Sequence, residues 1–276
     1  MNVDLKQQGA QFWDGNPCGG SWRNYSEFMD WIQRTEPYIF HVLDRYDWRD
    51  KRALEVGCGQ GSTLNYLPGL GAHMHGIDMS EASLARARAG AEEIGHADRV
   101  ELTLGDAEHL LFPDKFFDAV VCIGVLHHTQ NTERGVQEIW RVLKPGGFAI
   151  VMLYRSGNPK WWATQIVRGL SHIIDRVYGR QFVVADRLRY LQKNGDAQGT
   201  ALLELFGVPV LKASSNKECR AMFHDFSSVI ITNYQPGFER LCDILSWLQP
   251  FRTLLRYLDA RLQHYWGFYQ VIEAYK

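Results

Sequence analysis

The chain has 276 residues, of which 46% are hydrophobic and 22% charged, so wholesale disorder is excluded. Its 30 Lys and Arg residues against 31 Asp and Glu give a formal net charge of −1, so the chain has no net positive charge with which to bind nucleic acid or anionic lipid. Five scattered cysteines without a C-x-x-C pair argue against a disulfide framework and a zinc cluster. Because the N-terminal stretch is polar and no apolar run nears the length of a membrane span, we expect a soluble cytoplasmic protein.

Residues 1–50 are rich in aromatic side chains and are predicted to form a helical extension. Phe28, Trp31 and Val42 can line one helical face, and Pro37 breaks or starts a helix. Two interpretations remain open for these aromatic side chains. They pack on a sheet as a structural layer, or they form a lid over a ligand site; both can hold for different residues.

A glycine-rich turn follows the first predicted strand, residues 53–56. Residues 55–61 read Glu-Val-Gly-Cys-Gly-Gln-Gly, and residues 62–67 are predicted to start a helix. A strand, a glycine turn and a helix N-terminus let the backbone approach a ligand closely, because no Cβ intervenes. The dinucleotide fingerprint G-x-G-x-x-G lacks its third glycine here, since position 62 is Ser. Glu55 suits a cationic or amine-bearing ligand better than a phosphate.

Acidic residues end the next two predicted strands. Asp78 closes the strand at 73–78 and lies 21 residues beyond Gly57, a spacing at which a carboxylate reaches ribose hydroxyls in nucleotide-binding βαβ units. Ser80 then caps a helix. The alternative for Asp78 is a loop carboxylate stabilised by the helix dipole. A third strand at 100–104 is followed by Asp106 and Ala107.

Two adjacent histidines follow the central strand. The apolar run that ends at Cys122 is typical of a parallel strand buried on both faces. His127 and His128 lie beyond its carboxyl end, where the ligand-binding and active sites of open α/β sheets are found. Either histidine is a candidate proton acceptor; alternatively, one packs locally and the other only lines the ligand site. Adjacent side chains point apart and no third ligand is suitably spaced, so we predict no metal site.

The remainder of the chain alternates helices and strands around an insertion. A helical cap is expected at about 156–215, where Trp161 and Trp162 have helical spacing with later apolar residues. The other predicted elements are a helix at 133–143, a turn at 143–147, a strand at 148–154, a helix at 214–223, a strand at 227–234, a helix at 238–262 divided by Pro250, and a strand at 267–276.

The motif at 55–61, together with the two acids, the segment 112–122 that leads into the central apolar run, and the turn at 143–147, resembles the class I S-adenosylmethionine (SAM) dependent methyltransferases. The resemblance implies a Rossmann-like α/β fold whose seven-stranded sheet is mostly parallel, with the last strand antiparallel between strands five and six. It divides the chain into a lid at 1–50 and a SAM-binding domain at 51–276 that carries the cap. In this family the acid at the Asp106 position commonly accepts a hydrogen bond from the adenine amino group.

The resemblance implies SAM as cofactor and S-adenosylhomocysteine as product. It assigns cofactor binding to Glu55, Gly57, Cys58, Gly59, Gly61, Asp78, Met79, Asp106, Ala107, Ile123 and Gly124. We predict methyl transfer to oxygen or nitrogen of a small molecule, without nucleic-acid or membrane partners. The alternatives are a SAM-binding module without turnover and a methyltransferase acting on RNA or protein; the missing glycine disfavours an NAD-linked oxidoreductase. No residue identifies the acceptor, and the oligomeric state stays open.

Overall fold

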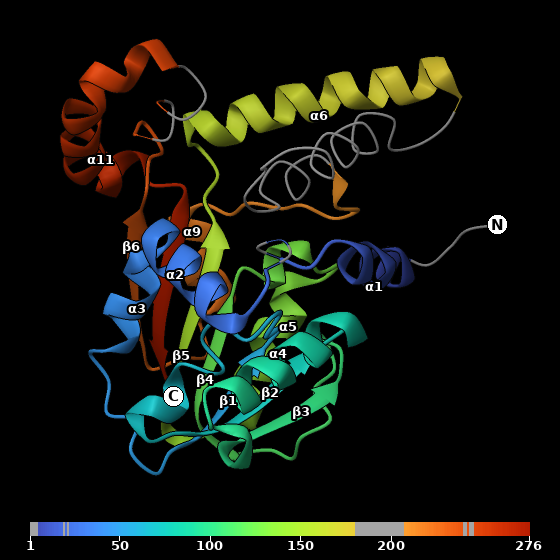
Figure 1. Ribbon diagram of the computed structural model, residues 1–276, viewed down its shortest axis with the longest axis vertical. Coiled ribbons are helices and arrows are strands. Elements are labelled where there is room, and N and C mark those ends of the chain that lie inside the picture. Colours follow the sequence, from blue (N-terminus) through green and yellow to red (C-terminus); the bar gives the residue numbers. More distant parts are fainter. Residues whose placement is uncertain (1–4, 19, 21, 180–206, 240–241, 243–245) are drawn as a thin grey trace.

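A seven-stranded sheet forms the centre of the computed structural model, which describes all residues except 1–4, 19, 21, 180–206, 240–241 and 243–245 (Figure 1). The strand order is β3-β2-β1-β4-β5-β7-β6. The strands are β1 (Arg52–Val56), β2 (His73–Asp78), β3 (Val100–Leu104), β4 (Phe117–Ile123), β5 (Leu143–Tyr154), β6 (Ser228–Tyr234) and β7 (Tyr269–Tyr275).

The last strand alone runs antiparallel to its neighbours. β7 pairs with β5 from Tyr154↔Tyr269 to Phe148↔Tyr275 and lies against β6 on its other side, whereas β1 to β5 pair in parallel. This arrangement confirms the predicted sheet. Central β4 is buried almost throughout, which explains its continuous apolar sequence.

Helices cover both faces of the sheet (Figure 1). One core combines alternate strand side chains with α3 and α4, and the other combines the opposite strand faces with α5 and α9. The helices are α1 (Leu5–Gly15), α2 (Tyr25–Thr35), α3 (Pro37–Leu43), α4 (Glu81–Glu93), α5 (Thr132–Val142), α6 (Pro159–Tyr178), α9 (Asn216–Met222) and α11 (Arg252–Trp266), with 3-10 turns η1 (Leu67–Leu70), η2 (Ala97–Arg99), η3 (Leu126–His128) and η4 (Ser246–Phe251). Within the described residues, no helix has the length and hydropathy needed to cross a membrane.

Three sequence-based boundaries need correction. The predicted helix after the glycine loop is a series of turns ending in η1, because Pro68 and the glycines around it interrupt regular helix geometry. β5 begins at Leu143, so the expected turn at 143–147 is part of the strand, held by hydrogen bonds of Gly146 and Gly147 with Lys276.

The third correction concerns the expected helix at 238–262. Its first residues are not helical, because the Asp259 carboxylate accepts the backbone N–H groups of Gly237, Phe238 and Glu239. Cys242 is α-helical, Pro250 lies in η4, and α11 starts at Arg252. α6 provides the first helix of the predicted cap; the apolar segments at 184–191 and 202–206 lie outside the described residues.

Candidate active site

A cavity of about 230 Å³ opens at the carboxyl ends of the parallel strands. Residues far apart in the sequence line it, including most of the predicted set. The predicted residues on its wall are Glu55, Gly57, Cys58, Gly59, Asp78, Met79, Asp106, Ala107, Ile123, Gly124 and His128. Gly61 and His127 lie outside this lining.

The glycine loop is fixed by backbone hydrogen bonds to the end of β2. The N–H groups of Gly57 and Cys58 both donate to the Ile77 carbonyl, at 2.7 and 2.9 Å. Gly57 has φ +70°, and a Cβ there would lie 2.3 Å from Val125 Cγ2. Glycine is therefore required at this position both for its backbone conformation and for space. Gly61 instead allows α4 to pack closely, since a Cβ would meet Ala87.

Glu55 is a buried carboxyl group at the cavity wall. The Thr63 hydroxyl donates to its Oε1, whereas Oε2 has no hydrogen-bond partner among the described residues. Burial raises the pKa of Glu55 to about 8. A buried carboxyl oxygen without a partner is costly unless a ligand supplies one, and a cationic amine would do so. SAM carries such an amine, so this residue fits the predicted cofactor.

Asp78 and Asp106 are held in place by contacts that the sequence did not reveal. Asp78 accepts the N–H groups of Gly59 at 2.8 Å and Ser80 at 2.9 Å, and burial raises its pKa. Asp106 Oδ2 contacts the Lys6 ammonium group at 2.6 Å. Partial burial raises the pKa of Asp106, but the hydrogen bonds from Lys6, the Glu108 N–H and His109, together with the charge of Lys6, outweigh burial, so the net pKa is lowered.

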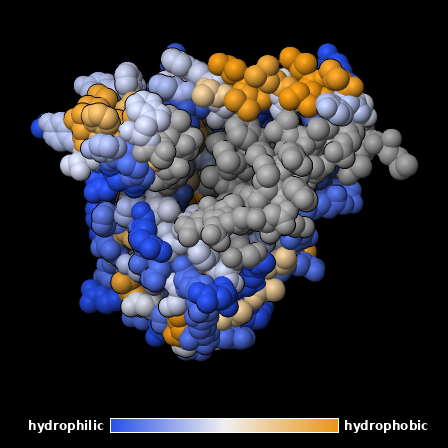
Figure 2. Space-filling model, turned by 45° about the horizontal axis from the view of Figure 1, so that its top comes forward, coloured by the Kyte–Doolittle hydropathy of each residue, from blue (hydrophilic) through white to orange (hydrophobic). Residues whose placement is uncertain are grey.

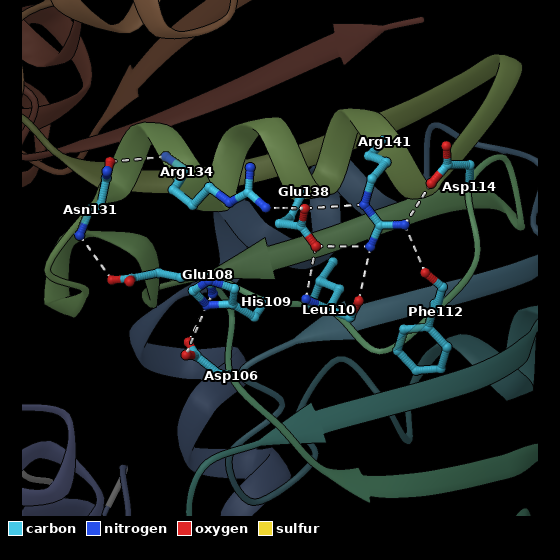
Figure 3. A network of polar contacts seen from close by, with 10 residues as sticks. All are labelled: Asp106, Glu108, His109, Leu110, Phe112, Asp114, Asn131, Arg134, Glu138 and Arg141. Carbon is cyan, nitrogen blue, oxygen red and sulfur yellow. Dashed lines mark hydrogen bonds and ion pairs between the residues drawn. The ribbon is translucent and has the colours of Figure 1, made fainter.

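A polar network fastens the segment after β3 to α5 (Figure 3). Glu108 accepts the Asn131 N–H at 2.8 Å, while Glu138 accepts the Leu110 N–H and pairs with Arg141. Asp106, Glu108 and His109 place their ligand atoms within 4.8 Å of one another, the spacing of a cation site. Lys6 forms ion pairs with both carboxylates, so its ammonium group supplies a positive charge there.

The two histidines occupy different environments. His127 is buried, stacks on Tyr154 with ring centroids 3.8 Å apart, and has no hydrogen-bond partner at either nitrogen among the described residues. Burial lowers its pKa well below the usual value, so the ring is neutral. His128 lines the cavity, and its Nδ1 lies 3.0 Å from the Val210 carbonyl oxygen. A carbonyl only accepts, so Nδ1 carries the proton and Nε2 of the neutral ring carries the lone pair.

The N-terminal helices supply both packing and cavity walls; that they act as a lid stays a prediction. Trp13, Phe28 and Trp31 line the cavity, and Trp13 contacts the His128 ring edge. The Tyr25 hydroxyl donates to the Gly61 carbonyl at 2.9 Å. The sequence analysis missed Lys6 as a site residue, because nothing local to its polar stretch indicates a partner 100 positions away.

Residues 54–151 match the family model of a methyltransferase domain. The chain is 37% identical over 125 residues to a sterol 24-C-methyltransferase of Gibberella zeae, covering 45% of this chain and 32% of that protein. It is 30% identical over 171 residues to a fatty-acid O-methyltransferase of Mycolicibacterium smegmatis, covering 61% of this chain and 60% of that protein. The chain thus spans a third to three fifths of the length of these relatives.

The fold is also similar to that of a solved methyltransferase. A geranyl diphosphate C-methyltransferase of Streptomyces coelicolor, solved with S-adenosylhomocysteine, superposes with a TM-score of 0.58 at 15% identity, covering 99% of this chain and 97% of that chain. That likeness concerns the fold, whereas the domain match and the motif at 55–61 concern the sequence itself. Residues 54–151 therefore match a methyltransferase domain, and the sheet order and glycine loop agree with the resemblance to the class I SAM-dependent methyltransferases.

Proposed function

We propose that the chain is a SAM-dependent methyltransferase that methylates an oxygen or nitrogen of an apolar small molecule. The carrying observation is that carboxyl groups from the ends of three neighbouring strands line the same cavity as His128. Three acids fit a ligand with an amine, a ribose and an adenine, and the histidine fits an acceptor that must lose a proton. Because groups suited to the cofactor and a group suited to the acceptor line the same cavity, methyl transfer is favoured over simple binding of SAM.

Glu55 would hold the amino group of SAM, Asp78 the ribose hydroxyls and Asp106 the adenine amino group. When bound, SAM supplies an electrophilic methyl group on a sulfonium centre. The chain's part is to position the acceptor in line and to exclude water, which can contribute several kcal/mol, up to about 7–11 in favourable intramolecular cases. The aromatic side chains of α1 and α2 at the cavity serve that exclusion.

His128 would accept the proton of the attacking group. Its Nδ1–H is directed at the Val210 carbonyl, which orients the ring and leaves the lone pair on Nε2. A base matters for oxygen or nitrogen acceptors, whose proton leaves at or before attack. His127 does not line the cavity, and its role would be to pack against Tyr154.

The acceptor end of the cavity is apolar and aromatic. Trp31, Ile32, Ile39, Val208 and Tyr269 contribute to it. The two sequence relatives reported above are named for a sterol and a fatty acid, which supports a lipophilic acceptor for this chain. Nucleic acid is not the expected substrate, and the free cysteines suit a reducing cytoplasm.

Calorimetric titration with SAM, S-adenosylhomocysteine and NAD in parallel tests the cofactor. We expect micromolar binding of both adenosyl compounds and none of NAD; the reverse result would overturn the proposal. Transfer of a labelled methyl group to a panel of lipophilic alcohols, carboxylic acids and amines then tests turnover. Tight SAM binding with no acceptor in any class would favour the non-catalytic SAM-binding module.

A further inference from the structure

Helix α6 has its polar side turned inward and its apolar side turned outward. Thr164 and Ser171, seven residues apart and therefore on one face, are buried, and Arg168 between them donates to the Val208 carbonyl at 3.3 Å. On the opposite face, Ile166 is 65% exposed, Ile173 60% and Val177 77%. A helix packed on a globular protein normally has the reverse orientation.

The outward face of α6 is apolar along its whole length. Figure 2 shows it as a hydrophobic band along one edge of the molecule. No charged residue interrupts this band; its exposed members are Trp162, Ala163, Ile166, Val167, Leu170, Ile173, Ile174, Val177 and Tyr178. Trp162 and Tyr178 lie near its two ends, and both are amphipathic rings of the kind that favours the boundary between water and lipid headgroups.

Helix α11 adjoins α6 and continues the exposed surface with aromatic side chains and cations. The Asn158 side chain, which caps α6, donates to the Trp266 carbonyl at the end of α11, and Arg155 donates to the neighbouring Tyr265 carbonyl. Exposed apolar side chains on η4 and α11 include Trp247, Phe251, Leu254, Tyr257 and Tyr265. Arg261 lies over the Tyr257 ring, 5.3 Å from its centroid.

The charge of these helices decides which partner fits. α6 and α11 together carry six Lys or Arg residues against two Asp, although the whole chain has a net charge of −1. Four of the six are directed elsewhere: Arg168 faces inward, Lys160 lies over the Phe268 ring, and Arg252 and Arg256 pair with Glu239. Arg176 and Arg261 are the cations that this surface presents. A second copy would bring the same arginines, Arg176 and Arg261, to the contact without an acidic partner among the described residues of this face, which like-charge repulsion disfavours. A bilayer with anionic lipid offers both an apolar layer and negative headgroups. The expectation of no membrane partner rested on the overall charge, which conceals this local excess.

We propose that the outward face of α6, with the exposed aromatic side chains of α11, docks on a bilayer surface containing anionic lipid. α6 lies in the interfacial plane, with its apolar side chains among the acyl chains and Arg176 and Arg261 at headgroup level. Lys160, in the first turn of α6, also lines the cavity. Docking therefore brings the acceptor end of the cavity to the surface from which a lipophilic molecule is drawn. This consequence rests on the proposed function, whereas the docking itself does not.

Flotation of the full chain with vesicles tests the docking. We expect binding to phosphatidylcholine vesicles that contain phosphatidylglycerol, weaker binding to phosphatidylcholine alone, and weakening by salt. Ile166→Glu should reduce the partition coefficient at least about tenfold, because it puts a charge into the apolar layer. Gln165→Glu is the matched control: it adds the same charge to an exposed neighbour off the apolar face and should change partitioning by less than about threefold.

Two further measurements keep the outcomes distinct. SAM titration of both variants should match the parent chain, which shows that they are folded and separates failure of docking from failure of the cofactor assignment. Absence of vesicle binding by the parent chain would overturn the proposal. A dimer in light scattering that Ile166→Glu dissociates, without vesicle binding, would also overturn it and would assign the face to a second copy.

Discussion

The cofactor end and the acceptor end of the cavity are built in different ways. At the cofactor end, Asp78 is held by two backbone amides, Asp106 by an ion pair, and the glycine loop by the carbonyl of Ile77. The proposed acceptor end is lined by residues from helices that lie far apart in the chain. One of these helices, α6, contributes Lys160 and exposes its apolar side to solvent. The acids assigned to the cofactor are thus fixed by local backbone contacts and one ion pair, whereas the proposed acceptor side depends on packing between distant segments.

The largest effect is expected at Gly57. Gly57→Ala should reduce SAM affinity at least about 100-fold, because the added Cβ would lie 2.3 Å from Val125 and the positive φ costs a further ~1 kcal/mol. Gly95→Ala is the control, since Gly95 has φ +73° with open space around its Cβ. It should lower the melting temperature slightly and leave calorimetric SAM binding unchanged. Equal SAM affinities in both variants would contradict the assignment of the loop.

The histidines test the acceptor end. His128→Ala should lower turnover by roughly 100-fold, the contribution of a positioned base, with SAM affinity within about threefold. His127→Phe should preserve turnover within about threefold, because that ring is neutral, stacked and without polar partners among the described residues. Kinetics and titration of both variants check this. Parallel losses of turnover and affinity in His128→Ala would mark it as cofactor lining, and a selective loss in His127→Phe would return the catalytic role to His127.

Asp78 tests the polar contacts of the cofactor end. Asp78→Ala should weaken SAM binding at least about tenfold, because it removes the ribose acceptor and leaves the N–H groups of Gly59 and Ser80 without their partner. Asp98→Ala, an exposed acid at η2, serves as the control. Unchanged affinity in the Asp78 variant would remove the ribose assignment.

Glu55 predicts a pH dependence of SAM binding. Its pKa of about 8 means that the free carboxyl is mostly protonated at pH 6 to 7, while an amine cation binds the ionised form. Affinity should therefore rise as pH rises, by up to about tenfold per pH unit below 8. Glu55→Gln should show lower affinity and a flat profile in this range. Calorimetry across pH measures both; a parallel slope in the variant would locate the titrating group elsewhere.

The smallest effect is expected for the contact between α1 and the adenine end. Lys6→Met should change SAM affinity by about two- to threefold, since a partly exposed ion pair contributes at most ~1 kcal/mol. The sign of the change in SAM affinity distinguishes two roles for Lys6. A weaker affinity in the variant means that Lys6 orients Asp106, and a stronger affinity means that Lys6 competes with the cofactor. Arg23→Met, which removes an exposed pair with Glu27, should have no effect on titration.

Much of the cofactor half could be predicted from the sequence, because its signals are local. Strand and acid are adjacent in the chain at Asp78 and Asp106, and the glycine turn follows its strand directly. Helix boundaries were less accurate where a distant group intervened, as Asp259 does at residues 237–239. Lys6 could not be found, since its partners lie about a hundred positions away.

The sequence by itself determined the order of strands and helices, the glycine loop and the three acids, because alternation, turn chemistry and spacing act over a few residues. Only the tertiary structure decided which histidine reaches the cavity and which side of α6 faces out. Neighbouring side chains such as His127 and His128 differ only in direction, and that direction is set by packing against Tyr154 and Val210. The amphipathic pattern of α6 was visible in the sequence, but its orientation depended on contacts between segments far apart in the chain.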